Sequence, residues 1–223
     1  MFADPSGYDN IVVIVGMPGD AGGTFEKTAD TYKKEHANDT VTIVYAKNYK
    51  NVSSLVSGVN SAFGSKGVDS MVYFGHSYEG GLSVFYHATN PPPNDNRWID
   101  ENTDWSAVKF NKGSTIYLFG CNGGTGEDNS IAQILANQTG STAYGYTSYS
   151  FFTNDSKLGN MQRQPKNSDV NKSKFKGKDL WLVPVNGKPM TKFTQKVKPS
   201  PTPPPKSGGS WTDWGFWPWN WFN

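Results

Sequence analysis

Short apolar runs alternate with amphipathic stretches along the first two thirds of the chain. The runs are rich in β-branched and aromatic residues, and they are Ile11–Gly16, Val41–Ala46, Ser70–Gly75, Thr115–Gly120 and Ser141–Ser148. Short runs of this kind are typical of buried strands. The amphipathic stretches carry apolar residues at helical spacing, and they are Thr24–Ala37, Ser53–Lys66 and Glu127–Asn137. This order predicts an α/β domain with a mostly parallel sheet and right-handed crossovers.

Polar residues mark the expected starts of the helices. Thr24 and Ser53 stand where an N-cap would satisfy the first backbone N–H groups. The third stretch opens with Glu127 and Asp128, and acidic side chains stabilise the positive end of a helix dipole. We therefore expect the helices to begin at these positions.

The segment Leu82–Asn111 breaks the alternation. Its first residues, LSVFYHA, allow a short strand, but NPPPNDNRW excludes regular structure because proline lacks a backbone donor. We expect a long irregular excursion that carries Trp98 and Trp105 at the edge of the sheet, where long loops are often functional. A later apolar run, Leu180–Val185, predicts a last strand, and Pro184 places it at an edge.

The C-terminal part has a different composition. Lys196–Ser210 is a linker that is rich in proline and then in glycine and serine. Trp211–Asn223 holds five of the eight tryptophans and a single charge, Asp213. Exposed aromatic clusters usually mark an interaction, and tryptophan favours the boundary between apolar and wet surroundings. The sequence leaves three contacts open for this tail: a membrane interface, a docking partner, or its own domain.

Composition limits the partners. A chain of 223 residues with 35% hydrophobic content is long enough for one sizeable core and a tail, or for two small domains. The net charge of +2 gives no reason to expect nucleic acid, and the C-terminal lysines are spaced as on a solvated surface. These lysines are Lys166, Lys172, Lys174, Lys176 and Lys178. No apolar run approaches the ~20 residues of a membrane-spanning helix, and without a signal-peptide pattern export would need another device or a larger parent chain.

Two of the predicted strands end in residues that can do chemistry. Cys121 follows Thr115–Gly120, and His76 follows Ser70–Gly75. The carboxyl ends of neighbouring parallel strands meet at one edge of a sheet, so the thiol and the imidazole would lie side by side. A nearby imidazole favours the thiolate, which is the nucleophilic form of cysteine. Either residue alone would more often be structural, but the pair predicts a catalytic site.

The surroundings of the cysteine bear on the chemistry. Gly120, Gly123 and Gly124 would let a substrate backbone approach closely and would leave N–H groups for an oxyanion. Cys121 is the only cysteine, which excludes an internal disulfide and a cysteine-rich metal site. With three histidines in the chain a zinc site is not expected, and the sequence predicts no cofactor.

A histidine after the third strand and a cysteine after the fourth resemble the pattern of caspase-like (clan CD) cysteine peptidases. His76 and Cys121 carry this likeness, each preceded by a hydrophobic run and a small residue. Ile116–Asn122 with Thr139–Gly140 is also similar to a bacterial domain of unknown function that has a YGC-N core. The resemblance implies a caspase-like three-layer fold, with a mostly parallel sheet and helices on both faces.

The same resemblance implies roles for individual residues. Cys121 would be the nucleophile, and His76 would be the general acid that protonates the leaving amine of a protein substrate. The backbone N–H groups of Cys121 and of the residue after the histidine would form the oxyanion hole. That residue is usually glycine in the family and is Ser77 here, so its N–H belongs to a backbone with less conformational freedom.

Two acidic residues suggest the preferred substrate. Asp20 lies in the loop after the first strand, and Glu79 follows His76 closely. In caspase-like enzymes a residue of that first loop reads the side chain that precedes the scissile bond. We expect Asp20 and Glu79 to select a basic residue there, with Gly120 beside the substrate backbone.

The first ten residues resemble another family. Phe2–Tyr8 contains Asp-Pro-Ser-Gly and is similar to the end of the core of RHS-repeat proteins, where a DPxG motif precedes a variable C-terminal toxin. This resemblance implies a secreted effector that is delivered into a target cell as part of a larger chain and neutralised by an immunity protein.

Two other functions stay open. The sequence GHSYEGG around Ser77 resembles the nucleophile elbow of α/β-hydrolases, although Glu79 stands where that motif has glycine and only His87 follows as a base. The other function is that of a catalytically degenerate interaction domain, which would bind through the Trp-rich tail.

Overall fold

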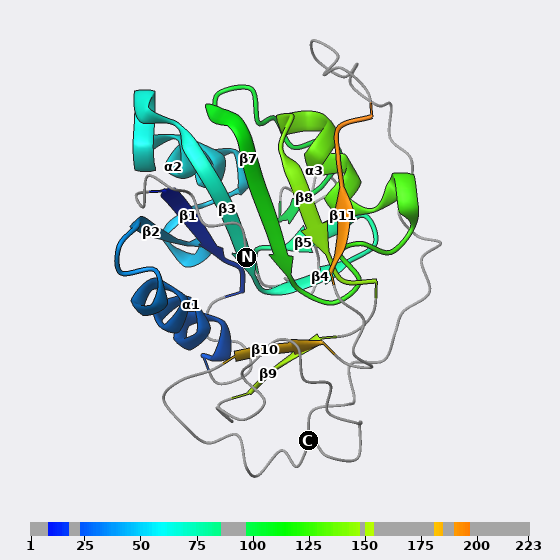
Figure 1. Ribbon diagram of the computed structural model, residues 1–223, viewed down its shortest axis with the longest axis horizontal. Coiled ribbons are helices and arrows are strands. Elements are labelled where there is room, and N and C mark those ends of the chain that lie inside the picture. The colour runs from blue at the N-terminus through cyan, green and yellow to red at the C-terminus, as the bar shows by residue number, and fades with distance from the viewer. Residues whose placement is uncertain are drawn as a thin grey trace.

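The computed structural model describes residues 9–17, 23–85, 97–147, 150–153, 181–184 and 190–196. Its main element is a six-stranded sheet in the order β11-β8-β7-β3-β1-β2 (Figure 1). Its strands are β1 (Asn10–Val15), β2 (Thr40–Tyr45), β3 (Val68–Phe74), β7 (Phe110–Phe119), β8 (Thr142–Gly145) and β11 (Thr191–Phe193). The α-helices of the described part are α1 (Thr24–Glu35), α2 (Val52–Phe63) and α3 (Ile131–Thr139).

The sheet is mostly parallel, as the sequence predicts. All pairings from β2 across to β8 are parallel, and β11 adds an antiparallel strand at the edge next to β8. In the register of the two central strands, Phe74 of β3 stands opposite Phe119 of β7. The carboxyl ends of β3 and β7 therefore lie next to each other.

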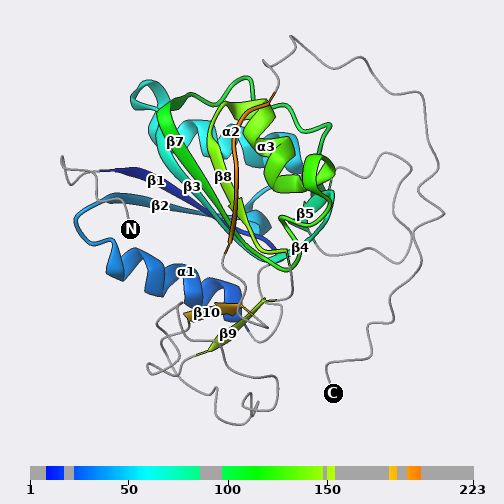
Figure 2. The same cartoon turned by 45° about the vertical axis from the view of Figure 1, so that its right-hand side comes forward.

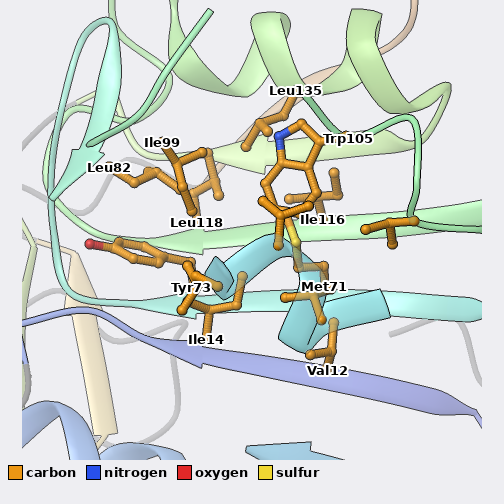
Figure 3. Close-up of a cluster of buried hydrophobic side chains, with 14 of the residues drawn as sticks. Val12, Ile14, Met71, Tyr73, Leu82, Ile99, Trp105, Ile116, Leu118 and Leu135 are labelled. Carbon is orange, nitrogen blue, oxygen red and sulfur yellow. The ribbon is translucent and has the colours of Figure 1, made fainter. Parts of the chain in front are cut away.

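Helices α2 and α3 cover one face of the sheet (Figures 1 and 2). Ile14, Met71 and Leu118 come from three neighbouring strands and pack in one buried cluster with Leu135 of α3 (Figure 3). Burial of each such side chain stabilises the fold by roughly 1.5–3 kcal/mol.

Helix α1 covers the opposite face, which completes three layers. Phe25 and Ala29 of this helix lie in a second buried cluster with Val13, Phe74 and Phe119. Residues of β1 alternate between the two clusters and are buried on both sides. Burial on both faces explains why this strand reads as a continuous apolar run.

A small antiparallel sheet follows β3 directly. Its strands are β4 (His76–Tyr78), β5 (Gly81–Ser83) and β6 (Trp98–Ile99). The expected irregular excursion is therefore partly regular, and its prolines lie among residues 86–96, outside the described residues. Trp105 was expected at the sheet edge but is 3% exposed in the core, where it belongs to the same cluster as Ile99.

The predicted N-caps Thr24 and Ser53 are wrong by one and two residues. Helix α1 starts after Gly23, which has a left-handed φ of 76°, and no side chain caps it. Asn51 caps α2, because its Oδ1 accepts the N–H of Ser54 at 2.9 Å while Ser54 Oγ accepts the N–H of Asn51 at 3.2 Å. This reciprocal capping box satisfies two backbone donors at once.

The third predicted helix divides into two parts. Glu127–Asn129 forms a short 3-10 helix, η4, and α3 begins only after Ser130. Ser130 Oγ donates to the carbonyl of Glu127 at 2.7 Å and accepts the N–H of Gln133 at 3.2 Å. The serine thus ends one helix and caps the next, which the acidic residues alone did not predict.

The last strands differ from the prediction. The run expected at Leu180–Val185 forms β10 (Trp181–Pro184), which pairs with β9 (Ser150–Thr153) in a separate two-stranded sheet. The main sheet ends instead with β11, a strand too short and polar to give an apolar run. The Asp-Pro-Ser-Gly start, the lysines from 166 to 178, the linker and the Trp-rich tail lie outside the described residues.

Candidate active site

The fold brings His76 and Cys121 to the same edge of the main sheet. Phe74 and Phe119 are register partners on β3 and β7, and their ring centroids are 5.2 Å apart in a stacked arrangement. His76 and Cys121 each follow two residues later. The predicted meeting of the two strand ends is therefore confirmed.

The His76 side chain lies on the α1 side of this edge. Its ring meets the ring of Phe25, in the first turn of α1, edge to face with centroids 5.1 Å apart. Phe74 and Phe119 belong to the buried cluster on this same side. His76 and Cys121 are both partly exposed, so solvent reaches each residue.

Ser77 links the histidine strand to the cysteine loop. It follows His76 on β4, and its Oγ donates a hydrogen bond of 2.6 Å to the carbonyl of Cys121. Its side chain is 9% exposed. A Cβ at Gly120 would lie 2.2 Å from Ser77 Oγ and 2.8 Å from the Gly75 carbonyl, so glycine is required there. Ser77 and Gly75 thus fill the space that a side chain at Gly120 would need. The predicted place of Gly120 beside a substrate backbone stays a prediction.

The Tyr73 hydroxyl binds the backbone carbonyl of His76. Its hydroxyl lies 2.7 Å from the carbonyl oxygen of His76 and 2.7 Å from that of Ser83. Figure 3 shows this hydroxyl at the end of the buried cluster. Burial holds the pKa of Tyr73 well above its usual value, so the hydroxyl stays protonated and donates. A Cβ at Gly16 or Gly75 would come within 2.6 Å of this oxygen, so both glycines make room for it.

The loop after Cys121 is fixed by backbone hydrogen bonds. Asn122 has a left-handed φ of 58°, and its carbonyl accepts the N–H of Thr125 at 3.0 Å. The N–H of Gly124 donates to Tyr146 at 2.8 Å. This bond corrects the expectation that Gly124 offers its N–H to an oxyanion, because that donor is already used within the fold.

Strained backbone gathers at this edge. Within the described ranges the non-glycine residues with positive φ are Met17, Asn122 and Glu127. Met17 follows β1, and the other two follow β7, so all three lie beyond the carboxyl ends of parallel strands. Left-handed non-glycine residues cost free energy and cluster at functional sites.

Of the two acidic residues predicted to select the substrate, the structure describes only Glu79. Glu79 is exposed in the turn between β4 and β5, and its carboxylate lies against Gly126. Its carbonyl accepts the N–H of Ile131 at 2.5 Å, which ties this turn to the start of α3. Asp20 lies outside the described residues, so selection of a basic substrate residue stays a prediction.

An open cavity of about 320 Å³ lies beyond the cysteine loop. Gly124, Thr147 and Phe193 line it together with the oppositely charged Glu127 and Lys196. Neither residue of the candidate pair is part of its lining. The cavity therefore borders the loop that follows Cys121, but the side chains of the candidate pair do not line it.

The described residues include no group of three or more His, Cys, Asp or Glu side chains that could hold a metal ion. Within the same ranges, no helix combines the length and the apolar character needed to cross a bilayer.

Sequence analysis missed Tyr73 as a member of the site. The only sign of it is a tyrosine inside an otherwise apolar strand run that ends at Gly75. Comparison with protein-family models, with curated proteins and with solved structures finds no match to this chain.

Proposed function

We propose that this protein is a cysteine endopeptidase with a caspase-like fold and a His76–Cys121 dyad. The observation that carries the proposal is the position of both residues, which follow the adjoining carboxyl ends of β3 and β7. The histidine follows the third strand of the chain and the cysteine follows the next strand of the main sheet, as in the family that the sequence resembles.

The proposed reaction uses the thiol as nucleophile. The Cys121 thiol gives its proton to His76, the thiolate Sγ attacks the carbonyl carbon of the scissile bond, and the backbone N–H groups of Cys121 and Ser77 stabilise the oxyanion. His76 gives a proton to the leaving amine as the C–N bond breaks. Water then hydrolyses the thioester, which releases the carboxylic acid and restores the thiol.

The environment of Ser77 weighs against the serine-hydrolase alternative. A nucleophile elbow places its serine on a sharp turn between a strand and a helix. Ser77 instead lies within β4, which is followed by β5, and its hydroxyl donates to the Cys121 carbonyl. A buried hydroxyl in this state is oriented toward the protein and away from a substrate.

The biological setting belongs to the same proposal. The Asp-Pro-Ser-Gly start supports a toxin effector at the C-terminal end of an RHS-type chain, with a protein substrate and an immunity protein as partners. The interaction-domain alternative rests on the Trp-rich tail and on Ser77 in place of glycine. Loss of toxicity on Cys121→Ala supports the enzyme, whereas retained toxicity supports the binder.

The direct test is cleavage of a peptide library, read by mass spectrometry. The parent chain should cut peptides and Cys121→Ala should cut none, with Arg or Lys before the cut sites. Ser114→Ala is the matched control, because Ser114 is a small buried residue in the middle of β7, seven positions before Cys121. Equal cleavage by parent and Cys121→Ala, or none by the parent, contradicts the proposal. Arg and Lys peptides cut no faster than Asp or Leu peptides would reject the basic preference alone.

A further inference from the structure

We infer that two buried hydroxyl groups, those of Tyr73 and Ser77, position the backbone of His76 and Cys121 for reaction. The inference rests on the proposed function in so far as it concerns peptide cleavage. Neither hydroxyl is placed to touch the reacting atoms, so both are positioning groups.

Each hydroxyl bonds the carbonyl of one member of the pair. Tyr73 Oη lies 2.7 Å from the His76 carbonyl, and Ser77 Oγ lies 2.6 Å from the Cys121 carbonyl. The tyrosine shares its single proton between that carbonyl and the carbonyl of Ser83, 2.7 Å away. These bonds join β3 to the β4–β5 hairpin, and the hairpin to the cysteine loop.

The surroundings make these bonds strong and specific. Tyr73 is 0% exposed and Ser77 is 9% exposed. Hydrogen bonds are stronger in a poorly solvated interior, and a carbonyl that loses its partner there is costly. Each hydroxyl also has a space kept open by glycine, at Gly75 for the tyrosine and at Gly120 for the serine. The backbone around the pair is thus shaped to admit these two groups.

A hydrogen bond to a carbonyl restrains the backbone from which the preceding side chain starts. The two bonds therefore restrain where the imidazole and the thiol can lie relative to each other. Displacements of about 1 Å in a reacting group can reduce a rate ~100-fold. The hydroxyls act through geometry, and the reactivity of the thiol depends on the groups that this geometry places around it.

Ser77 allows two explanations to be separated. If this position serves only through its backbone N–H, then glycine should perform as well as serine or better. If the hydroxyl positions Cys121, both Ser77→Gly and Ser77→Ala should be impaired. Tyr73→Phe tests the other bond, because it keeps the ring in the core and removes only the oxygen.

The experiment uses the full chain and two measurements. The first gives kcat and KM on a peptide that the parent cuts. The second is the rate at which iodoacetamide alkylates Cys121, the only cysteine, which requires no peptidase activity. Ser114→Ala is again the control, because it removes a buried serine hydroxyl that pairs with Ser141 at 2.7 Å, at the start of the stretch over which β7 pairs with β8. Thermal unfolding verifies that each variant is folded at the assay temperature.

We expect all three hydroxyl variants to lower kcat by about tenfold or more with KM within roughly twofold, since positioning acts on the transition state. Their alkylation rates should differ from that of the parent by at least about threefold, as expected when a thiol changes its surroundings. The control should match the parent in both measurements.

Parent-like alkylation rates in folded Tyr73→Phe and Ser77→Ala would overturn the inference, and so would a parent-like Ser77→Gly in both measurements. If the parent cuts no peptide, the proposed function fails. The alkylation rates then decide the positioning role by themselves.

Discussion

The centre of the main sheet and its carboxyl edge are held together in different ways. At the centre, apolar residues such as Val12, Val13 and Ile14 are fully buried between helix layers. At the edge, ring contacts are joined by hydroxyl-to-carbonyl bonds of Tyr73 and Ser77 and by close approaches to glycine. Stabilisation by apolar burial does not depend on direction and tolerates small shifts of the side chains. Each contact at the edge, in contrast, requires a particular atom at a particular position.

This difference separates stability from reactivity. Changes at the centre should lower the free energy of unfolding and leave the folded cysteine site unaltered. Changes at the edge should alter the reactivity of Cys121 more than they alter stability.

The largest effect on stability is expected for Leu55→Ala. Leu55 is 0% exposed on α2, and truncation of a buried leucine leaves a cavity that costs about 2–5 kcal/mol. Urea unfolding measures the loss, and the alkylation rate of Cys121 should stay within about twofold of the parent. Ser57→Ala on the exposed side of the same helix is the control and should change stability by less than about 0.5 kcal/mol. A large change in the alkylation rate of Cys121 in folded Leu55→Ala would show that the core and the carboxyl edge are coupled.

A smaller loss of stability with a large loss of reactivity is expected for Gly120→Ala. The new Cβ would lie 2.8 Å from the Gly75 carbonyl and 2.2 Å from Ser77 Oγ, so the loop must move. Overpacking of this kind costs about 1–3 kcal/mol, and we expect peptide cleavage to fall about tenfold or more.

Gly80→Ala is the matched control for this glycine. Gly80 lies in the turn between β4 and β5, and a Cβ there meets its nearest atom, in the Tyr78 ring, at 3.8 Å. Both measurements should therefore stay near the parent values. If the two alanine variants behave alike, the close packing at Gly120 does not contribute to peptide cleavage.

The smallest effect is expected for Asn51→Ala. This change removes the side-chain oxygen that accepts the Ser54 N–H at the start of α2. Loss of an N-cap costs about 1 kcal/mol, which denaturant unfolding can resolve. Cleavage and alkylation should be unchanged in the folded protein. A measurable loss of reactivity would show that the start of α2 communicates with the carboxyl edge.

The elements that could be predicted from the sequence are those that a local residue pattern encodes. The apolar runs that became β1 and β3 were identified because both faces of these strands are buried. The positions of His76 and Cys121 followed from the apolar runs of β3 and β7, since each residue comes directly after one of these runs. Strand β11 escaped prediction because its three residues form no apolar run.

Other features depend on contacts between distant residues. The partner of Ser77 is 44 positions away, and the second acceptor of Tyr73 is 10 positions away. Nothing in the local pattern shows such a partner. The caps were misplaced for a related reason, because Asn51 and Ser53 are both good capping residues and the reciprocal bond to Ser54 decides between them.

The most direct test of the dyad is a double-mutant cycle on peptide cleavage. It compares kcat/KM of the parent, His76→Ala, Cys121→Ala and the double variant on one peptide. Residues that act as a unit are not additive, so each single variant should lose about 1,000-fold or more and the double variant should lose no more. Parent-like cleavage by Cys121→Ala, or losses that multiply in the double variant, would contradict the account.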